Sequence, residues 1–125
     1  FELYLYDVNL GKESATGQLS EAEKQILDQE KYPYFSKSIC SNLDAKHFAT
    51  FYHTRPVFKI YNQNGVLLKE VTIIHPDTSS DDPTKLYFTD AFTTDKHIYA
   101  MWIGKNKNEI GRDLNAFRPE IMIFD

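Results

Sequence analysis

The sequence predicts an all-β protein built from repeated antiparallel sheet units, and three observations lead to this fold class. One motif occurs twice with a spacing of 50 residues, at 46–52 (KHFATFY) and at 96–102 (KHIYAMW). Each copy is followed by an apolar and aromatic pattern that ends in a turn residue, at 58–62 and at 121–125. Aromatic residues make up 14% of the chain, and they favour the half-buried surface of a pleated sheet. A period of about 50 residues is typical of arrays of sheet units such as the blades of a β-propeller.

The composition of the 125-residue chain limits its class and its partners. This length is typical of one domain, and a hydrophobic fraction of 42% is enough to form a core. A net charge of −4 gives no basic face for a nucleic acid, and no run of 18 apolar residues is present to cross a membrane. Cys40 is the only cysteine, which excludes an intramolecular disulfide and a cysteine metal cluster, and we expect it to be a small buried residue.

The N-terminal third is expected to hold the end of one sheet unit and a short helix. Residues 1–9 alternate as a strand does, whereas 12–19 are small and polar, which predicts a loop. Ser20 and Glu23 form a capping box, in which each side chain accepts a hydrogen bond from the backbone N–H of the other residue. One short inserted helix is therefore predicted near 20–31, against an edge of the sheet.

Residues 34–74 are predicted to form one complete four-stranded antiparallel unit. An inner strand is expected at 34–43. The motif strand at 46–52 carries apolar residues on both faces, which suits a strand between two neighbouring sheets. Two further strands form a hairpin over 57–74, and the Asn-Gly pair at its turn tolerates the positive φ that a tight hairpin requires.

The rest of the chain repeats this order incompletely. A polar loop at 75–85 leads to a strand at 86–92 and the second copy of the motif, and a long charged loop at 104–119 precedes a last strand at 120–124. Because a propeller has at least four blades, we expect a fragment of a larger protein, with assembly of several chains into a ring as the alternative. The predicted division is the end of one blade at 1–12, a complete blade at 34–74 and most of the next blade at 86–125.

Three segments together suggest a family. Residues 60–70, 90–105 and 120–125 resemble, in order and spacing, the TolB-like six-bladed β-propeller proteins of the Bacteroides type. The resemblance covers 46–125 and includes no catalytic motif, and the helix near 20–31 is not part of the family pattern. It implies a six-bladed ring of unassigned function that is exported to the periplasm or the outer-membrane surface, with a lipid anchor in the full-length protein.

Histidine and aspartate residues between the two units make the best metal candidate by residue type. His75, Asp77, Asp81 and Asp82 share one loop, and loop carboxylates can gather a hard cation. The loop lacks the D-x-[DN]-x-[DN]-G pattern of a calcium site. We therefore expect a solvated acidic turn, with no metal and no cofactor.

The other histidines and the aromatic residues of the motif are expected to be structural. His47 and His53 are six residues apart, which in a strand is about 20 Å and too far for one metal ion. His97 repeats His47 at the start of a strand. Tyr99 and Trp102 resemble sugar-stacking residues, but their place on a buried strand favours the core.

The sequence has no nucleophile elbow, phosphate loop, dinucleotide fingerprint or H-E-x-x-H motif, so no catalytic residue is predicted. The predicted binding surface lies in three polar loops. The loops at 53–56, 75–85 and 104–119 are expected to meet on one face. Their polar residues are the predicted binding residues: His53, Arg55, His75, Asp77, Asp81, Asp82, Lys105, Arg112 and Arg118.

Two functions remain open from the sequence. The first is a non-catalytic propeller of the bacterial cell envelope that binds a ligand or protein, with an unknown protein or glycan as the partner. The alternative is a fragment of a propeller enzyme that acts on polysaccharide, with its catalytic residues mostly outside this chain. Self-association through unpaired blade edges is expected in either case.

Overall fold

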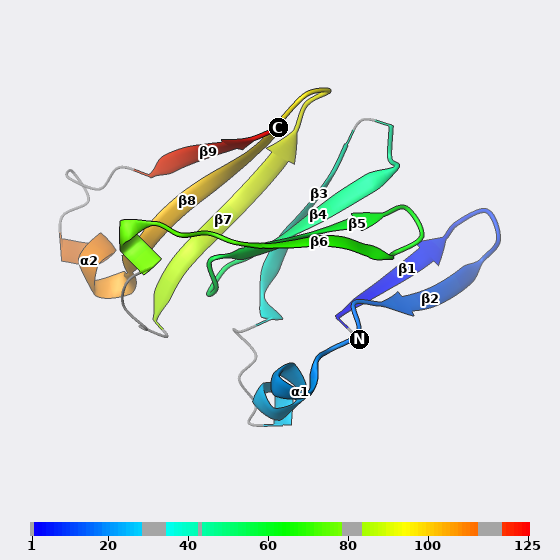
Figure 1. Cartoon of the computed structure of the whole chain (residues 1–125), viewed down its shortest axis with the longest axis horizontal. Helices are drawn as coiled ribbons and strands as arrows, with labels where there is room; N and C mark the ends of the chain where they lie inside the picture. Colours follow the sequence, from blue (N-terminus) through cyan, green and yellow to red (C-terminus); the bar gives the residue numbers. More distant parts are fainter. Residues whose placement is uncertain (1, 29–34, 43, 79–83, 113–118) are drawn as a thin grey trace.

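The computed structural model describes residues 2–28, 35–42, 44–78, 84–112 and 119–125, and their arrangement is shown in Figure 1. The strands are β1 (Leu3–Asp7), β2 (Lys12–Thr16), β3 (Lys37–Ser41), β4 (His47–Tyr52), β5 (Val57–Asn62), β6 (Leu67–Thr72), β7 (Lys85–Thr93), β8 (Ile98–Asn106) and β9 (Glu120–Phe124). The helices are α1 (Glu21–Asp28), the 3₁₀ turn η2 (Pro76–Thr78) and α2 (Lys107–Arg112).

The described strands form three antiparallel sheets, which confirms the all-β, antiparallel part of the prediction. β1 pairs with β2, β3 to β6 form a four-stranded sheet in chain order, and β7 to β9 form a three-stranded sheet in chain order. Because each strand pairs with its neighbour in sequence, every connection within a sheet is local. The four-stranded sheet covers most of the segment 34–74.

The main core lies between the four-stranded sheet and the three-stranded sheet. Phe51 of β4 stacks on Phe58 of β5 with ring centroids 4.9 Å apart, and it also meets the edge of Phe88 on β7 at 5.0 Å. Phe88 in turn meets Trp102 of β8 at 5.1 Å. These aromatic side chains are buried and join the two sheets face to face.

The opposite face of β4 is buried as well, as the apolar residues on both of its faces predicted. Ala49 and Phe51 face the three-stranded sheet, whereas Thr50 and Tyr52 are also fully buried. The Tyr52 hydroxyl donates to Glu2, which precedes the β1–β2 hairpin. Consequently β4 lies between two neighbouring layers.

Two local signals in the sequence are confirmed in detail. Glu23 N donates to Ser20 Oγ and Ser20 N donates to Glu23 Oε1, each at 3.2 Å, so the capping box starts α1. In the β5–β6 turn, Gly65 has a φ of 81° and its N–H donates to Asn62 O at 2.9 Å. The predicted end of the first helix near residue 31 lies outside the described residues.

The prediction of a loop over 12–19 is wrong in its first part, because residues 12–16 form β2. This strand is polar, and it is specified by pairing with β1 and not by its own pattern. The Thr16 hydroxyl also donates to the carbonyl of Gly65, which fixes this hairpin against the β5–β6 turn.

The prediction of a single helix and of a continuous loop over 104–119 is also wrong. β8 continues to Asn106, and α2 follows it directly. The Asn106 side chain accepts a hydrogen bond from Glu109 N at 2.8 Å, which is the geometry of a helix N-cap. Asparagine is a preferred residue at that position, so the cap explains the second helix.

A buried ionic cluster connects the N-terminal segment to the four-stranded sheet. Glu2 accepts hydrogen bonds from Lys37 Nζ at 2.6 Å, from Tyr52 Oη at 2.5 Å and from Lys59 Nζ at 3.0 Å. Burial alone would raise the pKa of Glu2. The hydrogen bonds from Lys37 and Tyr52, together with the charge of Lys37 and the hydrogen bond from Lys59, outweigh burial and lower the pKa to about 2.

Candidate functional site

The segment after β4, the segment after β6 and the start of β7 lie together at one end of the sheets. Tyr87 N at the start of β7 donates to His53 O after β4, at 2.7 Å. Ile73 N after β6 donates to Pro56 O at 2.7 Å. The start of β7, α2 and the start of β9 lie at this same end, on the left in Figure 1.

The segment that carries His75 and Asp77 is held in a compact turn. Thr78 N donates to His75 O at 2.9 Å, and the Thr78 hydroxyl donates to the same carbonyl at 2.8 Å. Pro76 follows His75, and a residue before proline is biased toward an extended backbone. The chain therefore leaves β6 extended and turns at η2, which places His75 and Asp77 side by side.

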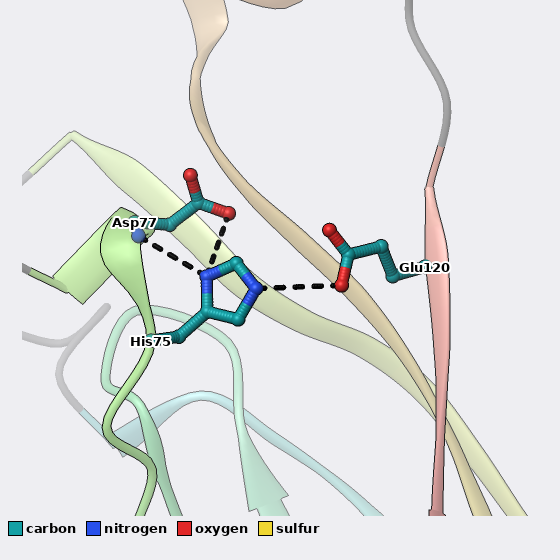
Figure 2. Close-up of side chains that lie close together, drawn as sticks. All are labelled: His75, Asp77 and Glu120. Carbon is teal, nitrogen blue, oxygen red and sulfur yellow. Dashed lines mark hydrogen bonds and ion pairs between the residues drawn. The ribbon is translucent and has the colours of Figure 1, made fainter.

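His75 lies between the carboxylate of Asp77, two residues further along the chain, and that of Glu120, which comes from a distant segment (Figure 2). Its Nδ1 is 3.2 Å from Asp77 Oδ2, and its Nε2 is 3.4 Å from Oε2 of Glu120, the first residue of β9. Nδ1 also accepts a hydrogen bond from the backbone N–H of Asp77 at 3.1 Å. Nδ1 therefore faces both the carboxylate and the backbone N–H of Asp77, whereas Nε2 faces Glu120.

Asp77 is fixed by donors from β8. The indole N–H of Trp102 donates to Asp77 Oδ2 and Lys105 Nζ donates to Asp77 Oδ1, each at 3.2 Å. Burial raises the pKa of Asp77, but these two hydrogen bonds and the charges of Lys105 and His75 lower it below its ordinary value. The Asp77 side chain is therefore an anion with a defined orientation.

Gly104 makes room for this carboxylate. A Cβ atom at Gly104 would lie 2.7 Å from Asp77 Cγ, a distance that no relaxed contact allows. Gly104 also has a φ of 66°, in the left-handed region that residues with a side chain rarely adopt. The absence of a side chain at this position of β8 is thus what admits Asp77 to the site.

His53 is held by the protein's own serines. Its Nδ1 pairs with Ser36 Oγ at 2.8 Å and its Nε2 pairs with Ser38 Oγ at 2.9 Å. Burial, followed by the charge of Lys37, lowers the pKa of His53, which favours the neutral ring. The geometry gives this side chain a structural role beside β3.

Arg55 likewise faces the interior. Its guanidinium stacks over the ring of Tyr52 at 3.9 Å from the centroid and lies 3.8 Å from Glu23 Oε2 on α1. Of the other predicted binding residues, Lys105 belongs to the site around Asp77. Asp81, Asp82 and Arg118 lie outside the described residues, as does the side chain of Arg112.

Sequence reasoning missed Glu120 and the role of Trp102. Glu120 is 45 residues after His75, and nothing in their spacing relates them. The only signal for Glu120 was its place as the first residue of a predicted strand. Trp102 was assigned to the core, which is correct because it is fully buried, but its indole N–H also reaches the site.

A pocket of about 230 Å³ lies at the opposite end of the sheets, where both copies of the repeated motif meet. His47 and His97 line it together with Cys40. His97 Nδ1 lies 2.8 Å from Asp125 Oδ1, so this histidine connects the start of β8 to the end of β9. Burial, followed by the charge of Asp90, raises the pKa of the Cys40 thiol to about 11, which keeps it protonated and poorly nucleophilic.

No family model, curated protein or solved structure matches this chain. The resemblance to TolB-like propellers therefore stays a prediction. In the described part of the chain, no helix is long and apolar enough to span a membrane.

Proposed function

We propose that this chain is a non-catalytic binding module built from β-propeller-type sheets. Its partner, a protein or a glycan, binds the end of the sheets at which His75, Asp77, Lys105 and Glu120 gather. The family resemblance of the sequence adds the bacterial cell envelope as the place where this binding occurs.

One observation carries the proposal. Two antiparallel sheets, each with its strands in chain order, stack face to face, and the β4–β5 and β6–β7 connections approach each other at one end of them. Stacked sheets of this kind are the construction of propeller blades, whose loops on one face form binding surfaces. Placing the function at these loops is an analogy at the level of the fold, supported by the charged groups that meet there.

The outer face of the three-stranded sheet supports the propeller arrangement. Phe92, Met101, Ile121 and Ile123 are exposed there, although each is large and apolar. Phe92 also stacks on Tyr99 with ring centroids 5.1 Å apart, so this face is aromatic as well. A further sheet of the same kind would bury these side chains, just as this sheet buries one face of the four-stranded sheet.

The chemistry of the site favours binding over catalysis. Asp77 has a lowered pKa and both of its oxygens accept hydrogen bonds, which makes it a poor general acid. The Thr78 hydroxyl lies beside His75 but donates to the backbone carbonyl of that residue, so the imidazole does not activate it. Lys105, which is partly exposed, offers a cation to an anionic partner.

A glycan array with a parallel turnover assay tests the proposal. Wild-type chain is expected to bind anionic glycans without releasing sugar, and Lys105→Gln is expected to weaken that binding about tenfold because a charged contact is lost. Lys96→Gln, which changes an exposed lysine at the opposite end of the sheets, serves as the matched control and should bind as the wild type does. Release of sugar by the wild type would contradict the proposal and favour the polysaccharide enzyme.

A further inference from the structure

We propose that His75, Asp77 and Glu120 form a binding site for a divalent transition-metal ion, with Zn²⁺ as the preferred ion. This inference goes beyond the proposed binding function and does not depend on it, because it needs only three side chains of this chain. The sequence predicted no metal here, since the acidic residues nearest to His75 along the chain suggested a solvated turn.

Two segments of the chain deliver the three ligands to one point. His75 precedes η2, Asp77 belongs to η2, and Glu120 begins β9. Each offers one ligand atom, and these atoms all lie within 4.8 Å of one another. Ligands of a tetrahedral zinc ion, with bonds of about 2.0–2.2 Å, stand roughly 3.4 Å apart. His75 Nε2 and Glu120 Oε2 already stand 3.4 Å apart, and the Glu120 side chain is 58% exposed.

The donor set decides the class of ion. One imidazole nitrogen and two carboxylate oxygens suit Zn²⁺ and related first-row ions, whereas Ca²⁺ prefers ligand shells made of oxygen alone. Two lysines contact Asp77, because Lys105 Nζ donates to its Oδ1 and Lys85 Nζ donates to its backbone carbonyl. The carboxylates of Asp77 and Glu120 are the anionic ligands that the ion meets beside these lysines.

Hydrogen bonds from neighbouring residues hold the Asp77 carboxylate in one orientation, as such bonds do for carboxylates that bind metal ions. The fully buried Trp102 directs its indole N–H at Oδ2, and Lys105 holds Oδ1. Gly104 leaves the space in which the carboxylate sits. Hydrogen bonds of this kind fix ligating carboxylates before an ion arrives, and their loss typically lowers metal affinity by about 10–100-fold.

The alternative is a simple hydrogen-bonded connection from η2 through His75 to β9. The distance of 3.4 Å between His75 Nε2 and Glu120 Oε2 is longer than the usual 2.7–3.2 Å of an N–H···O hydrogen bond. This separation leaves the pair poorly matched as a hydrogen bond, whereas an ion bound to both groups would hold them at its own coordination distances.

Equilibrium dialysis of the metal-stripped chain against Zn²⁺ tests the inference. One ion per chain is expected, and Glu120→Gln should weaken binding at least about tenfold because it replaces an anionic ligand with a neutral amide. His75→Gln should weaken binding at least as much. Co²⁺ should bind in the same place and give a visible absorption spectrum that Glu120→Gln removes, and Ca²⁺ at the same concentration should not bind.

Two matched variants control for surface binding. Glu109→Gln changes an exposed carboxylate on α2 at the same end of the sheets, and His47→Gln changes an exposed histidine at the other end. Both should bind Zn²⁺ as the wild type does. The inference is overturned if wild-type chain binds no Zn²⁺ or if Glu120→Gln binds it as tightly as the wild type. Glu120 is exposed, so its variant is expected to fold even if His75→Gln does not. Because no glycan is present, this outcome is independent of the test of the proposed function.

Discussion

At the scale of single residues, Glu2 is a buried carboxylate whose hydrogen-bond partners lie far from it in the sequence. Its side chain is almost fully buried, and it accepts hydrogen bonds from Lys37, Tyr52 and Lys59, which belong to three strands of the four-stranded sheet. A buried carboxylate is stable only when its charge is compensated. Glu2 and the two lysines therefore depend on one another, and together they attach the N-terminal segment to the sheet.

Stability is expected to depend on pH through Glu2. The pKa of Glu2 is about 2 in the folded chain, against an ordinary value of 4.5. A carboxyl group with a lowered pKa contributes stability that is complete above the ordinary value and disappears as pH falls toward the folded value. The contribution is on the order of 3 kcal/mol. Urea unfolding at neutral pH and at a series of acid pH values should show this loss between about pH 4.5 and pH 2.

The variant Glu2→Gln isolates this effect. It leaves Lys37 and Lys59 buried without their anion, so we expect about 3–5 kcal/mol less stability at neutral pH and a flatter acid dependence. Glu21→Gln is the control, since Glu21 is exposed and its ion pair with Lys24 contributes less than about 1 kcal/mol. Equal destabilisation by the two variants would show that the Glu2 cluster has no special role.

At the scale of elements, the candidate site depends on how closely η2 approaches β8. The contact is made by Asp77 of η2 with Trp102 and Lys105 of β8, and Lys85 Nζ of β7 donates to the backbone carbonyl of Asp77. Gly104 lies between the two β8 donors in the sequence. Because η2 has only three residues, its position is set by these side-chain contacts and not by its own hydrogen bonds.

The variant Gly104→Ala is expected to displace η2. The new Cβ would meet the Asp77 carboxylate, and alanine disfavours the positive φ of this position, so we expect a loss of about 2–3 kcal/mol in the free energy of unfolding. Gly111→Ala is the matched control. Gly111 lies in α2, where a Cβ atom meets nothing within 4 Å, and alanine there should raise stability by up to about 1 kcal/mol. Chemical denaturation measures both, and unchanged stability of Gly104→Ala would contradict the close approach.

At the scale of the whole molecule, the layers are asymmetric in how they are covered. The four-stranded sheet is covered by the β1–β2 hairpin and its flanking residues on one face and by the three-stranded sheet on the other. The outer face of the three-stranded sheet exposes Ile121 and Ile123 of β9 beside Phe92 and Met101. An apolar sheet face of this kind is a surface at which proteins associate.

Self-association of the isolated chain is therefore expected, and Ile121→Thr combined with Ile123→Thr should reduce it. Both side chains are more than half exposed, so the double variant should change the stability of the monomer by less than about 1 kcal/mol. Sedimentation velocity over a range of concentrations measures the association. Ile39→Thr, an exposed position on β3, is the control and should associate as the wild type does. A wild-type chain that stays monomeric throughout would show that this face has no partner of its own kind.

The parts of the fold that depend on neighbouring residues could be predicted from the sequence, whereas other parts could not. The two-sided burial of β4, the Asn-Gly turn after β5 and the capping box of α1 were all predicted, because each depends on residues within one strand or one turn. β2 was not predicted, because its sequence is polar and only its pairing with β1 makes it a strand. α2 was not predicted, because a helix of six residues has too little periodicity to be distinguished from a charged loop.

The same distinction between local properties and contacts of distant residues applies to the candidate site. The sequence by itself determined the antiparallel strands of the two larger sheets and the repeat of the motif strand after 50 residues, because side-chain alternation and turn chemistry are local properties. Only the tertiary structure decided that His75 and Asp77 meet Glu120, that Trp102 donates its N–H to Asp77 and that Glu2 is buried against two lysines. The physical reason is that such contacts join residues 25 or more positions apart, and their formation depends on the packing of whole sheets, which leaves no pattern in the local sequence.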